Sequence, residues 1–266
     1  MKNRLVQKLK EARKEKRKLF CAYLTLGFPR LSVTEALIPA LEQAGADIIE
    51  LGFPFSDPLA DGPTIQFTSA QANEKGVKLK NAFELIRRLR RRGVKIPILF
   101  FSYLNPLMHY GMTHAIREMH QSGFDGFIVP DLPPEEGHMW EPWAKRLDLS
   151  LVYLMAPTTT HHRMRMIAKR SNGFIYYVSL RGVTGARNVI PSDLTKNLRA
   201  IKKITRKPVL VGFGVAREEQ AKAMARLSDG IIVGSALMER MRNGRGPVRR
   251  VISLATRLIR AIRPEA

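Results

Sequence analysis

The residues Ala44-Gly45-Ala46-Asp47-Ile48-Ile49-Glu50-Leu51 join the end of a helical pattern to a short apolar strand through a tight, glycine-containing turn. Related patterns occur at Ser122-Gly123-Phe124-Asp125-Gly126-Phe127-Ile128 and at Ser228-Asp229-Gly230-Ile231-Ile232. In each of them a helix end turns into a run that is apolar on both faces, which is typical of a buried parallel strand. The chain is therefore expected to repeat a strand–helix unit.

Working outward from this stretch, the same alternation of apolar runs and amphipathic segments extends along the chain. Strands are expected at Leu19–Thr25, Asp47–Leu51, Pro97–Tyr103, Gly126–Pro130, Leu149–Met155, Phe174–Ser179, Pro208–Val211 and Gly230–Val233. Helices are expected at Val33–Gln43, Pro63–Gly93 in two pieces, Leu107–Gln121, Glu135–Arg146, His161–Lys169, Asp193–Ile204, Glu218–Leu227 and Ala236–Ile262, the last with a break at Gly244–Pro247. This order predicts an α/β fold, a single (β/α)8 TIM barrel that spans residues 1–266 as one catalytic domain. An open, doubly wound sheet is the alternative, because periodicity does not show closure. An extra N-terminal helix should cover the barrel bottom.

Two carboxylates stand in different surroundings in the run from Ile49 to Gly62. Glu50 lies at the carboxyl end of a buried strand, where loss of hydration raises the pKa of a carboxylic acid toward neutrality. Asp61 lies in the following loop, which can fold back over the same mouth. A salt bridge for Glu50 and a helix cap for Asp61 are the structural alternatives, although Pro63 makes Gly62 the better cap. The pair is the candidate for acid–base catalysis.

Composition places the chain among ordinary globular proteins, with 45% hydrophobic and 26% charged residues in 266. The single cysteine, Cys21, lies in an apolar run and is expected to be a packed core thiol. No apolar run is long enough to span a membrane or to form a signal peptide, so a soluble, cytoplasmic protein is expected.

The formal net charge of +22 is unusual for a metabolic enzyme. The basic residues cluster at 2–18, 87–95, 163–170, 199–207 and 240–263, where they alternate with apolar stripes such as Leu5, Leu9 and Ala12. This alternation favours solvated outer faces of helices over a polyanion partner, since no zinc finger, RNA-binding signature or aromatic ladder accompanies the charge. Only weak, nonspecific binding of nucleic acid is therefore expected.

Glycines follow the last two expected strands, at Gly212-Phe213-Gly214 and at Gly234-Ser235. In a barrel these two loops commonly bind phosphate, because glycine lets the backbone approach and a helix N-terminus favours an anion. The polar segment 179–188 could act as a lid over this end, or could be an exposed loop without function. No Lys, His or Cys is expected at the carboxyl end of a strand, which argues against Schiff-base chemistry and against a zinc-assisted aldol reaction.

The run Ile49–Gly62, followed by Pro63-Thr64-Ile65-Gln66, closely resembles the hallmark segment of the tryptophan synthase α subunit family. Gly182-Val183-Thr184-Gly185, Gly212-Phe213-Gly214 and Gly234-Ser235-Ala236 match that family in the same order. The resemblance implies a cofactor-free retro-aldol lyase that cleaves indole-3-glycerol phosphate to indole and glyceraldehyde 3-phosphate. It also implies a pyridoxal-phosphate β subunit as partner in an α2β2 complex, with Ser56-Asp57-Pro58, Asn105 and Pro133 facing it.

The resemblance assigns roles to individual residues. Glu50 would protonate indole C3 and assist removal of the glycerol hydroxyl proton, while Asp61 would accept a hydrogen bond from the ring N–H. The remaining substrate-binding residues would be Tyr23, Phe101, Tyr103, Leu132, Tyr176 and Phe213 around the indole, with Thr184, Gly185, Gly214, Gly234 and Ser235 toward the phosphate. A stand-alone, indole-releasing lyase and a non-catalytic activator of the β subunit are the alternatives.

Overall fold

The structure is a computed structural model that describes residues 3–178, 192–212, 214–242 and 246–263. Its strands are β1 (Leu19–Thr25), β2 (Ile48–Gly52), β3 (Ile98–Phe101), β4 (Gly126–Ile128), β5 (Ser150–Val152), β6 (Leu154–Met155), β7 (Ile175–Val178), β8 (Val209–Gly212) and β9 (Gly230–Val233). Its helices are α1 (Arg4–Lys14), α2 (Leu31–Gln43), α3 (Pro63–Glu74), α4 (Leu79–Arg91), α5 (Leu104–Tyr110), α6 (Met112–Ser122), the 3₁₀ helix η1 (Pro134–Met139), α7 (Glu141–Arg146), α8 (His161–Arg170), α9 (Ser192–Ile204), α10 (Glu218–Leu227), α11 (Ser235–Arg242) and α12 (Pro247–Ile262).

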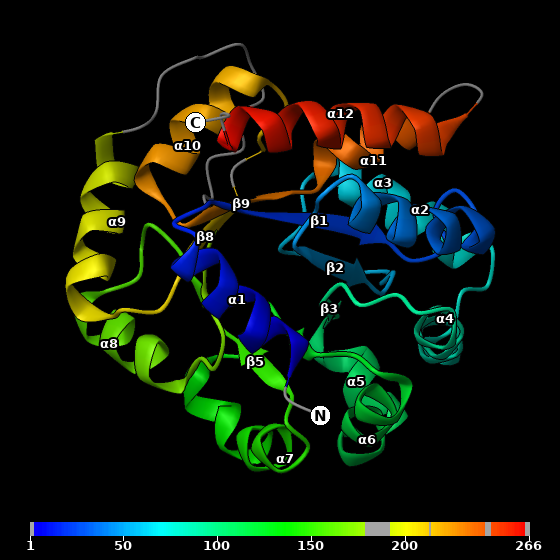
Figure 1. Cartoon of the computed structure of the whole chain (residues 1–266). Helices are drawn as coiled ribbons and strands as arrows, with labels where there is room; N and C mark the ends of the chain where they lie inside the picture. The colour runs from blue at the N-terminus through cyan, green and yellow to red at the C-terminus, as the bar shows by residue number, and fades with distance from the viewer. Residues whose placement is uncertain (1–2, 179–191, 213, 243–245, 264–266) are drawn as a thin grey trace.

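The strands form one parallel barrel with helices outside it (Figure 1). β1 pairs with both β2 and β9, so the first and last strands close the ring. The hydrogen-bonded order runs from β5 through β1 to β6, and β5 and β6 are separated in the chain by Tyr153 alone. The predicted barrel is confirmed, and the open doubly wound alternative is wrong.

The expected fifth strand, Leu149–Met155, is divided into β5 and β6. β5 pairs with β4, whereas β6 pairs with β7. Between them the backbone N–H of Tyr153 donates to Ser171 Oγ at 3.0 Å, which takes this residue out of the strand ladder. The expected helix Leu107–Gln121 is likewise divided into α5 and α6, because Gly111 has a φ of +90°. The expected helix Glu135–Arg146 is divided into η1 and α7 at Trp140.

An aspartate before a strand is used three times to hold neighbouring strands together. Asp47 Oδ2 accepts from Phe20 N at 2.8 Å, and Asp125 Oδ2 accepts from Ile98 N at 2.9 Å. Asp229 Oδ2 accepts from Val209 N at 2.9 Å. Each carboxylate therefore satisfies an N–H group at the start of the adjacent strand, which explains why the sequence pattern around residue 47 recurs.

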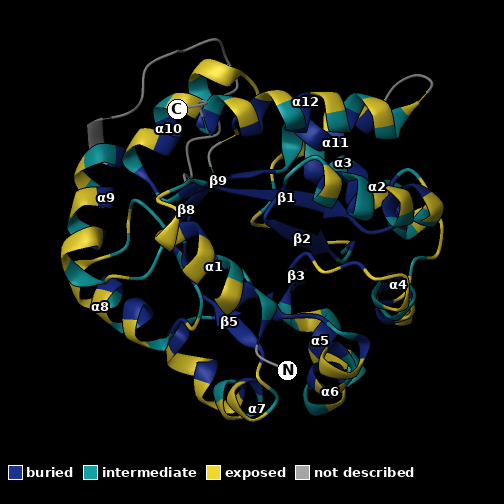
Figure 2. Ribbon diagram, in the orientation of Figure 1, coloured by how far each residue is buried: buried dark blue, intermediate teal, exposed yellow. Residues whose placement is uncertain are grey.

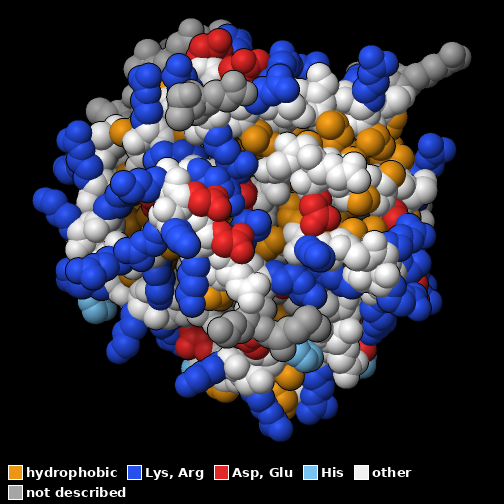
Figure 3. Space-filling view, in the orientation of Figure 1, with side chains coloured by type: hydrophobic (Ala, Val, Ile, Leu, Met, Phe, Trp, Pro, Cys, Tyr) orange, Lys and Arg blue, Asp and Glu red, His pale blue; other side chains and the backbone are white. Residues whose placement is uncertain are grey.

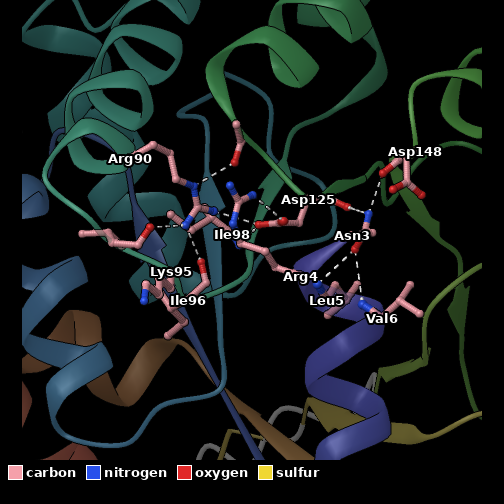
Figure 4. A network of polar contacts seen from close by, with 12 residues as sticks. Asn3, Arg4, Leu5, Val6, Arg90, Lys95, Ile96, Ile98, Asp125 and Asp148 are labelled. Atoms are coloured by element: carbon pink, nitrogen blue, oxygen red, sulfur yellow. Dashed lines mark hydrogen bonds and ion pairs between the residues drawn. The ribbon is translucent and has the colours of Figure 1, made fainter. Parts of the chain in front are cut away.

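The helix α1 covers the amino ends of the strands, as predicted, and its apolar stripe of Leu5, Leu9 and Ala12 is buried (Figures 1 and 2). Asn3 caps it by accepting from Leu5 N and Val6 N. Figure 4 shows Arg4 and Arg90 meeting at the carboxylate of Asp125, at 2.9 and 2.8 Å. The interpretation of the basic run 87–95 as solvated is therefore wrong for Arg90, whose side chain is only 11% exposed.

Candidate active site

Glu50 lies near the carboxyl end of β2 and is completely buried. It stands beside Tyr23 of β1 and Leu99 of β3 in the strand register. Its Oε1 has no hydrogen-bond partner among the described residues, and its Oε2 lies 4.0 Å from Cys21 Sγ. Burial, with a smaller contribution from the charge of Asp61, raises the pKa of Glu50 to about 8. No ion pair involves Glu50 in the described part of the chain, so the salt-bridge alternative is wrong.

Asp61 lies in the loop that follows β2 and is held by Tyr103. The Tyr103 hydroxyl donates to Asp61 Oδ2 at 3.0 Å and accepts from Ala60 N at 2.9 Å. Gly62 occupies the cap position of α3 and Pro63 its first turn, so Asp61 is free of the capping role, as predicted. Burial raises the pKa of Asp61 to about 6, and the hydrogen bond from Tyr103 opposes that rise.

The two carboxyl groups consequently differ in charge near pH 7. Glu50, with a pKa of about 8, is mostly protonated and can donate a proton. Asp61, with a pKa of about 6, is mostly ionised and can accept a hydrogen bond or stabilise a cation. Environments that separate the pKa values of two titratable groups are a mark of an acid–base site.

Aromatic side chains surround these carboxylates. Tyr23 and Phe101 meet edge to face at 5.7 Å between ring centroids, and Phe101 and Tyr103 do so at 6.3 Å. The pKa of Tyr176 is raised by burial and then by the charge of Glu50, which places its hydroxyl within the electrostatic reach of that carboxylate. Tyr23, Phe101, Tyr103 and Tyr176 are thus brought together with Glu50 and Asp61. Leu132 is buried in the loop after β4.

Glycine at the end of β2 makes room for this arrangement. A Cβ atom added to Gly52 would lie 2.1 Å from the hydroxyl oxygen of Tyr23. That separation is far below van der Waals contact, so any larger residue would displace the ring. Gly52 therefore fixes where Tyr23 can place its hydroxyl at the mouth.

The structure places Cys21 beside Glu50, whereas the sequence reasoning placed it only in the core. It is buried, as expected, but its thiol faces the carboxyl group of Glu50. Burial and then the charge of Glu50 raise the pKa of the Cys21 thiol. The signal was available, because side chains two residues apart on a strand share a face and Tyr23 was already expected to line the site.

The expected phosphate end is described only in part. Gly234 lies directly before α11, and Ser235 is the first residue of that helix. Gly214 has a φ of +57°, and a Cβ atom placed there would have no neighbour within 4 Å. Thr184, Gly185, Phe213 and the expected lid 179–188 lie outside the described residues.

Two classes of feature are absent from the described part of the chain. No group of three or more His, Cys, Asp or Glu side chains is arranged to hold a metal ion there. No described helix is long and apolar enough to cross a membrane.

The raised pKa of Glu50 predicts how stability depends on pH. A carboxyl group whose pKa rises from 4.5 to about 8 on folding favours the folded state most below pH 4.5, and this contribution is lost as the pH rises through about 8. Glu50→Gln removes the cost of ionising this buried group, so the variant should be the more stable protein at pH 8, by on the order of a few kcal/mol. Urea unfolding at several pH values measures the difference.

The difference between Glu50→Gln and the unmodified protein should shrink as the pH falls toward 4.5. Glu84→Gln is the matched control, because Glu84 is an exposed residue of α4 and should show no such difference. A stability difference for Glu50→Gln that is the same at pH 5 and pH 8 would contradict the assignment.

Comparison with known proteins connects this geometry to a family. The family model described as tryptophan synthase alpha chain matches residues 9–260. Tryptophan synthase alpha chains from Dehalococcoides mccartyi and Chloroflexus aggregans are both 44% identical to this chain, over 85% and 90% of it and over 88% and 90% of their own lengths. The solved tryptophan synthase subunit alpha from Legionella pneumophila superposes with a TM-score of 0.91 at 32% identity, covering 98% of this chain and 99% of that one. A chain of tryptophan synthase from Mycobacterium tuberculosis gives a TM-score of 0.88 at 30% identity, with the same coverage of both chains.

Proposed function

The chain belongs to the tryptophan synthase alpha chain family, and we propose that Glu50 and Asp61 are the catalytic carboxylates of its reaction. That reaction is the cleavage of indole-3-glycerol phosphate to indole and glyceraldehyde 3-phosphate in tryptophan biosynthesis. It needs no cofactor in the alpha chain. The observation that carries the assignment is the pair of carboxyl groups, of buried Glu50 and partly buried Asp61, whose pKa values, about 8 and about 6, fall on opposite sides of neutrality.

Each step of the cleavage has a group suited to it. Glu50, protonated at pH 7, donates its proton to indole C3 and so makes the ring cationic. The resulting carboxylate then accepts the proton of the glycerol hydroxyl as the carbon–carbon bond breaks, so the proton that reached C3 is replaced on Glu50. Asp61, ionised at the same pH, accepts a hydrogen bond from the ring N–H and stabilises the positive charge. The hydrogen bond from Tyr103 holds that carboxylate in place before the charge develops.

The remaining expected residues complete a substrate site of two parts. Tyr23, Phe101, Tyr103, Leu132, Tyr176 and Phe213 are proposed to enclose the indole, which the edge-to-face ring contacts of Tyr23, Phe101 and Tyr103 support. Thr184, Gly185, Gly214, Gly234 and Ser235 are proposed for the glycerol phosphate end. The start of α11 at Ser235 and the open space beside Gly214 support that half, because a helix N-terminus and an accessible backbone favour an anion. On this proposal residues 1–266 act as one catalytic domain.

A β subunit is the proposed partner, in a cytoplasmic α2β2 complex, with pyridoxal phosphate held by the β subunit and indole passed to it. Leu59, Met108 and Met139 are large hydrophobic residues with 93%, 52% and 46% of their surface exposed. Leu59 follows the expected partner-facing residues Ser56-Asp57-Pro58, Met108 lies in α5 with Asn105, and Met139 ends η1, the helix that follows Pro133. Exposed large apolar side chains are what an interface would bury. The M. tuberculosis relative is named tryptophan synthase, which also supports a complex.

Indole release from indole-3-glycerol phosphate by the purified chain, with and without a β subunit, tests this proposal. Activity that rises several-fold on addition of the β subunit is expected. Equally high activity without it would favour a stand-alone, indole-releasing lyase. A folded chain that binds the β subunit but releases no indole in any mixture would show a non-catalytic activator instead.

A further inference from the structure

A basic groove lies at the barrel bottom, at the opposite end of the strands from Glu50. Two cavities of about 360 and 440 Å³ adjoin there, between α1 and the segment that follows α9. They share the lining residues Leu9, Arg13, Thr205, Arg206, Lys207 and Pro208. Leu19 and Pro208, at the amino ends of β1 and β8, place the groove under the barrel. The two cavities thus form one hollow, called here the α1–α9 groove.

The lining of the α1–α9 groove carries almost only positive charge. Eight of its residues are Lys or Arg, and Asp229 is the single acidic one. Figure 3 shows Lys and Arg side chains gathered on this face, on the side of α1 toward α8 and α9. A concave surface of one sign with apolar residues such as Leu9 and Ala12 in its wall concentrates the field of those charges.

Four of these eight cations make hydrogen bonds or ion pairs within the folded chain. Arg17 pairs with Asp47 and Glu15, and Lys18 donates to Ser228 O. Lys202 lies 3.5 Å from Asp229, and Lys207 donates to carbonyl oxygens at the end of α8, among them Ala168 O at 2.6 Å. These four are accounted for without a ligand.

The other half have no recorded partner among the described residues. Lys10, Arg13, Lys16 and Arg206 are exposed, and no hydrogen bond or ion pair is made by their side chains. The negative end of the α1 dipole explains a cation at Arg13, which lies in the last turn. It does not explain Lys10 or Arg206, which lie outside the last turns of α1 and α9. Burial also lowers the pKa of Lys18 and Lys207.

We propose that the α1–α9 groove binds a short linear phosphate chain, through Lys10, Arg13, Lys16 and Arg206. Lys10 lines one cavity, Lys16 lines the other, and Arg13 and Arg206 line both, so the free cations are spread over the groove and suit several phosphates in a row better than a single one. None of its lining residues is aromatic, so it offers nothing on which nucleobases could stack. This favours an inorganic oligophosphate over a nucleic acid. The site is separate from the lyase centre and does not depend on it.

Calorimetric titration with inorganic tripolyphosphate at about 0.15 M salt tests the proposal. One saturable site is expected, with orthophosphate binding at least roughly tenfold more weakly because it offers fewer charges. The triple variant Arg13→Ser, Lys16→Ser, Arg206→Ser should weaken tripolyphosphate binding about tenfold or more. Its lyase activity and melting temperature should be retained, which shows that the variant is folded.

A matched control removes the same amount of charge elsewhere. Lys80, Lys95 and Lys222 are exposed and lie outside both cavities, so their triple replacement by Ser should leave tripolyphosphate binding unchanged. Equal weakening in both triple variants would overturn the proposal, because diffuse surface charge would then be sufficient. Absence of saturable binding would also overturn it. A single-stranded RNA that binds more tightly than tripolyphosphate and is lost in the groove variant would replace it with a nucleic-acid surface.

Discussion

Glu50→Gln is expected to lower kcat/KM for indole-3-glycerol phosphate by roughly 10³- to 10⁴-fold, at the upper end of what one acid–base group supplies. Glutamine has nearly the shape of glutamic acid but can neither give a proton to indole C3 nor accept one from the glycerol hydroxyl. Both proton transfers are assigned to this one carboxyl group, so both are lost together. The measurement is steady-state indole release, with kcat and KM separated.

The pH profile makes this expectation specific to Glu50. For the unmodified protein, kcat/KM should rise as Asp61 ionises near pH 6 and fall as Glu50 loses its proton near pH 8. The residual activity of Glu50→Gln should lack the alkaline fall. Glu84→Gln, the exposed control on α4, should keep the full rate and both limbs. If Glu50→Gln retained more than a tenth of the activity, Glu50 would not be the acid.

The features that were predictable from sequence are those that depend on residues within one short segment. The aspartates at 47, 125 and 229 each stand before an apolar run, and the structure uses all three to bind the neighbouring strand. This recurring pattern of an aspartate before an apolar run indicates the repeating strand–helix unit and therefore the barrel. The burial of Glu50 was similarly predictable from its place in an apolar strand, and because such burial costs free energy it indicated a candidate functional residue.

The features that were not predictable depend on partners distant in sequence. Nothing near Tyr153 indicates that its N–H group will bond to Ser171 and divide a strand. Arg90 lies in a run of arginines, and only the fold places its guanidinium against Asp125 and the carbonyl oxygens of Gly123 and Ile96. The sequence indicated that Cys21 shares a face of its strand with Tyr23, but which residue of β2 the thiol meets depends on the register of β1 against β2. The local sequence pattern predicts which face of a helix or strand is buried. It does not predict which residues of other elements that face will contact, because those contacts depend on tertiary packing.

Asp61→Asn is expected to lower kcat/KM by about 10²- to 10³-fold, the usual cost of losing one preorganised electrostatic contact at a developing charge. The amide can still meet the indole ring, but it carries no negative charge to stabilise the cation formed by protonation at C3. The acidic limb of the pH profile near pH 6 should disappear, since the group that titrates there is gone. The alkaline limb should also move to lower pH, because the charge of Asp61 contributes to the raised pKa of Glu50.

Tyr103→Phe separates the charge of Asp61 from its placement. This variant keeps the carboxylate but removes the hydroxyl that donates to it and that accepts from Ala60 N. Because that hydrogen bond lowers the pKa of Asp61, the acidic limb should move to higher pH, with a loss of about tenfold in rate. Asp148→Asn is the control for Asp61→Asn. It makes the same change from Asp to Asn at an exposed residue of the barrel bottom, and both limbs of the pH profile should stay in place. An unchanged acidic limb in Asp61→Asn would assign the pKa near 6 to another group and leave Asp61 without its electrostatic role.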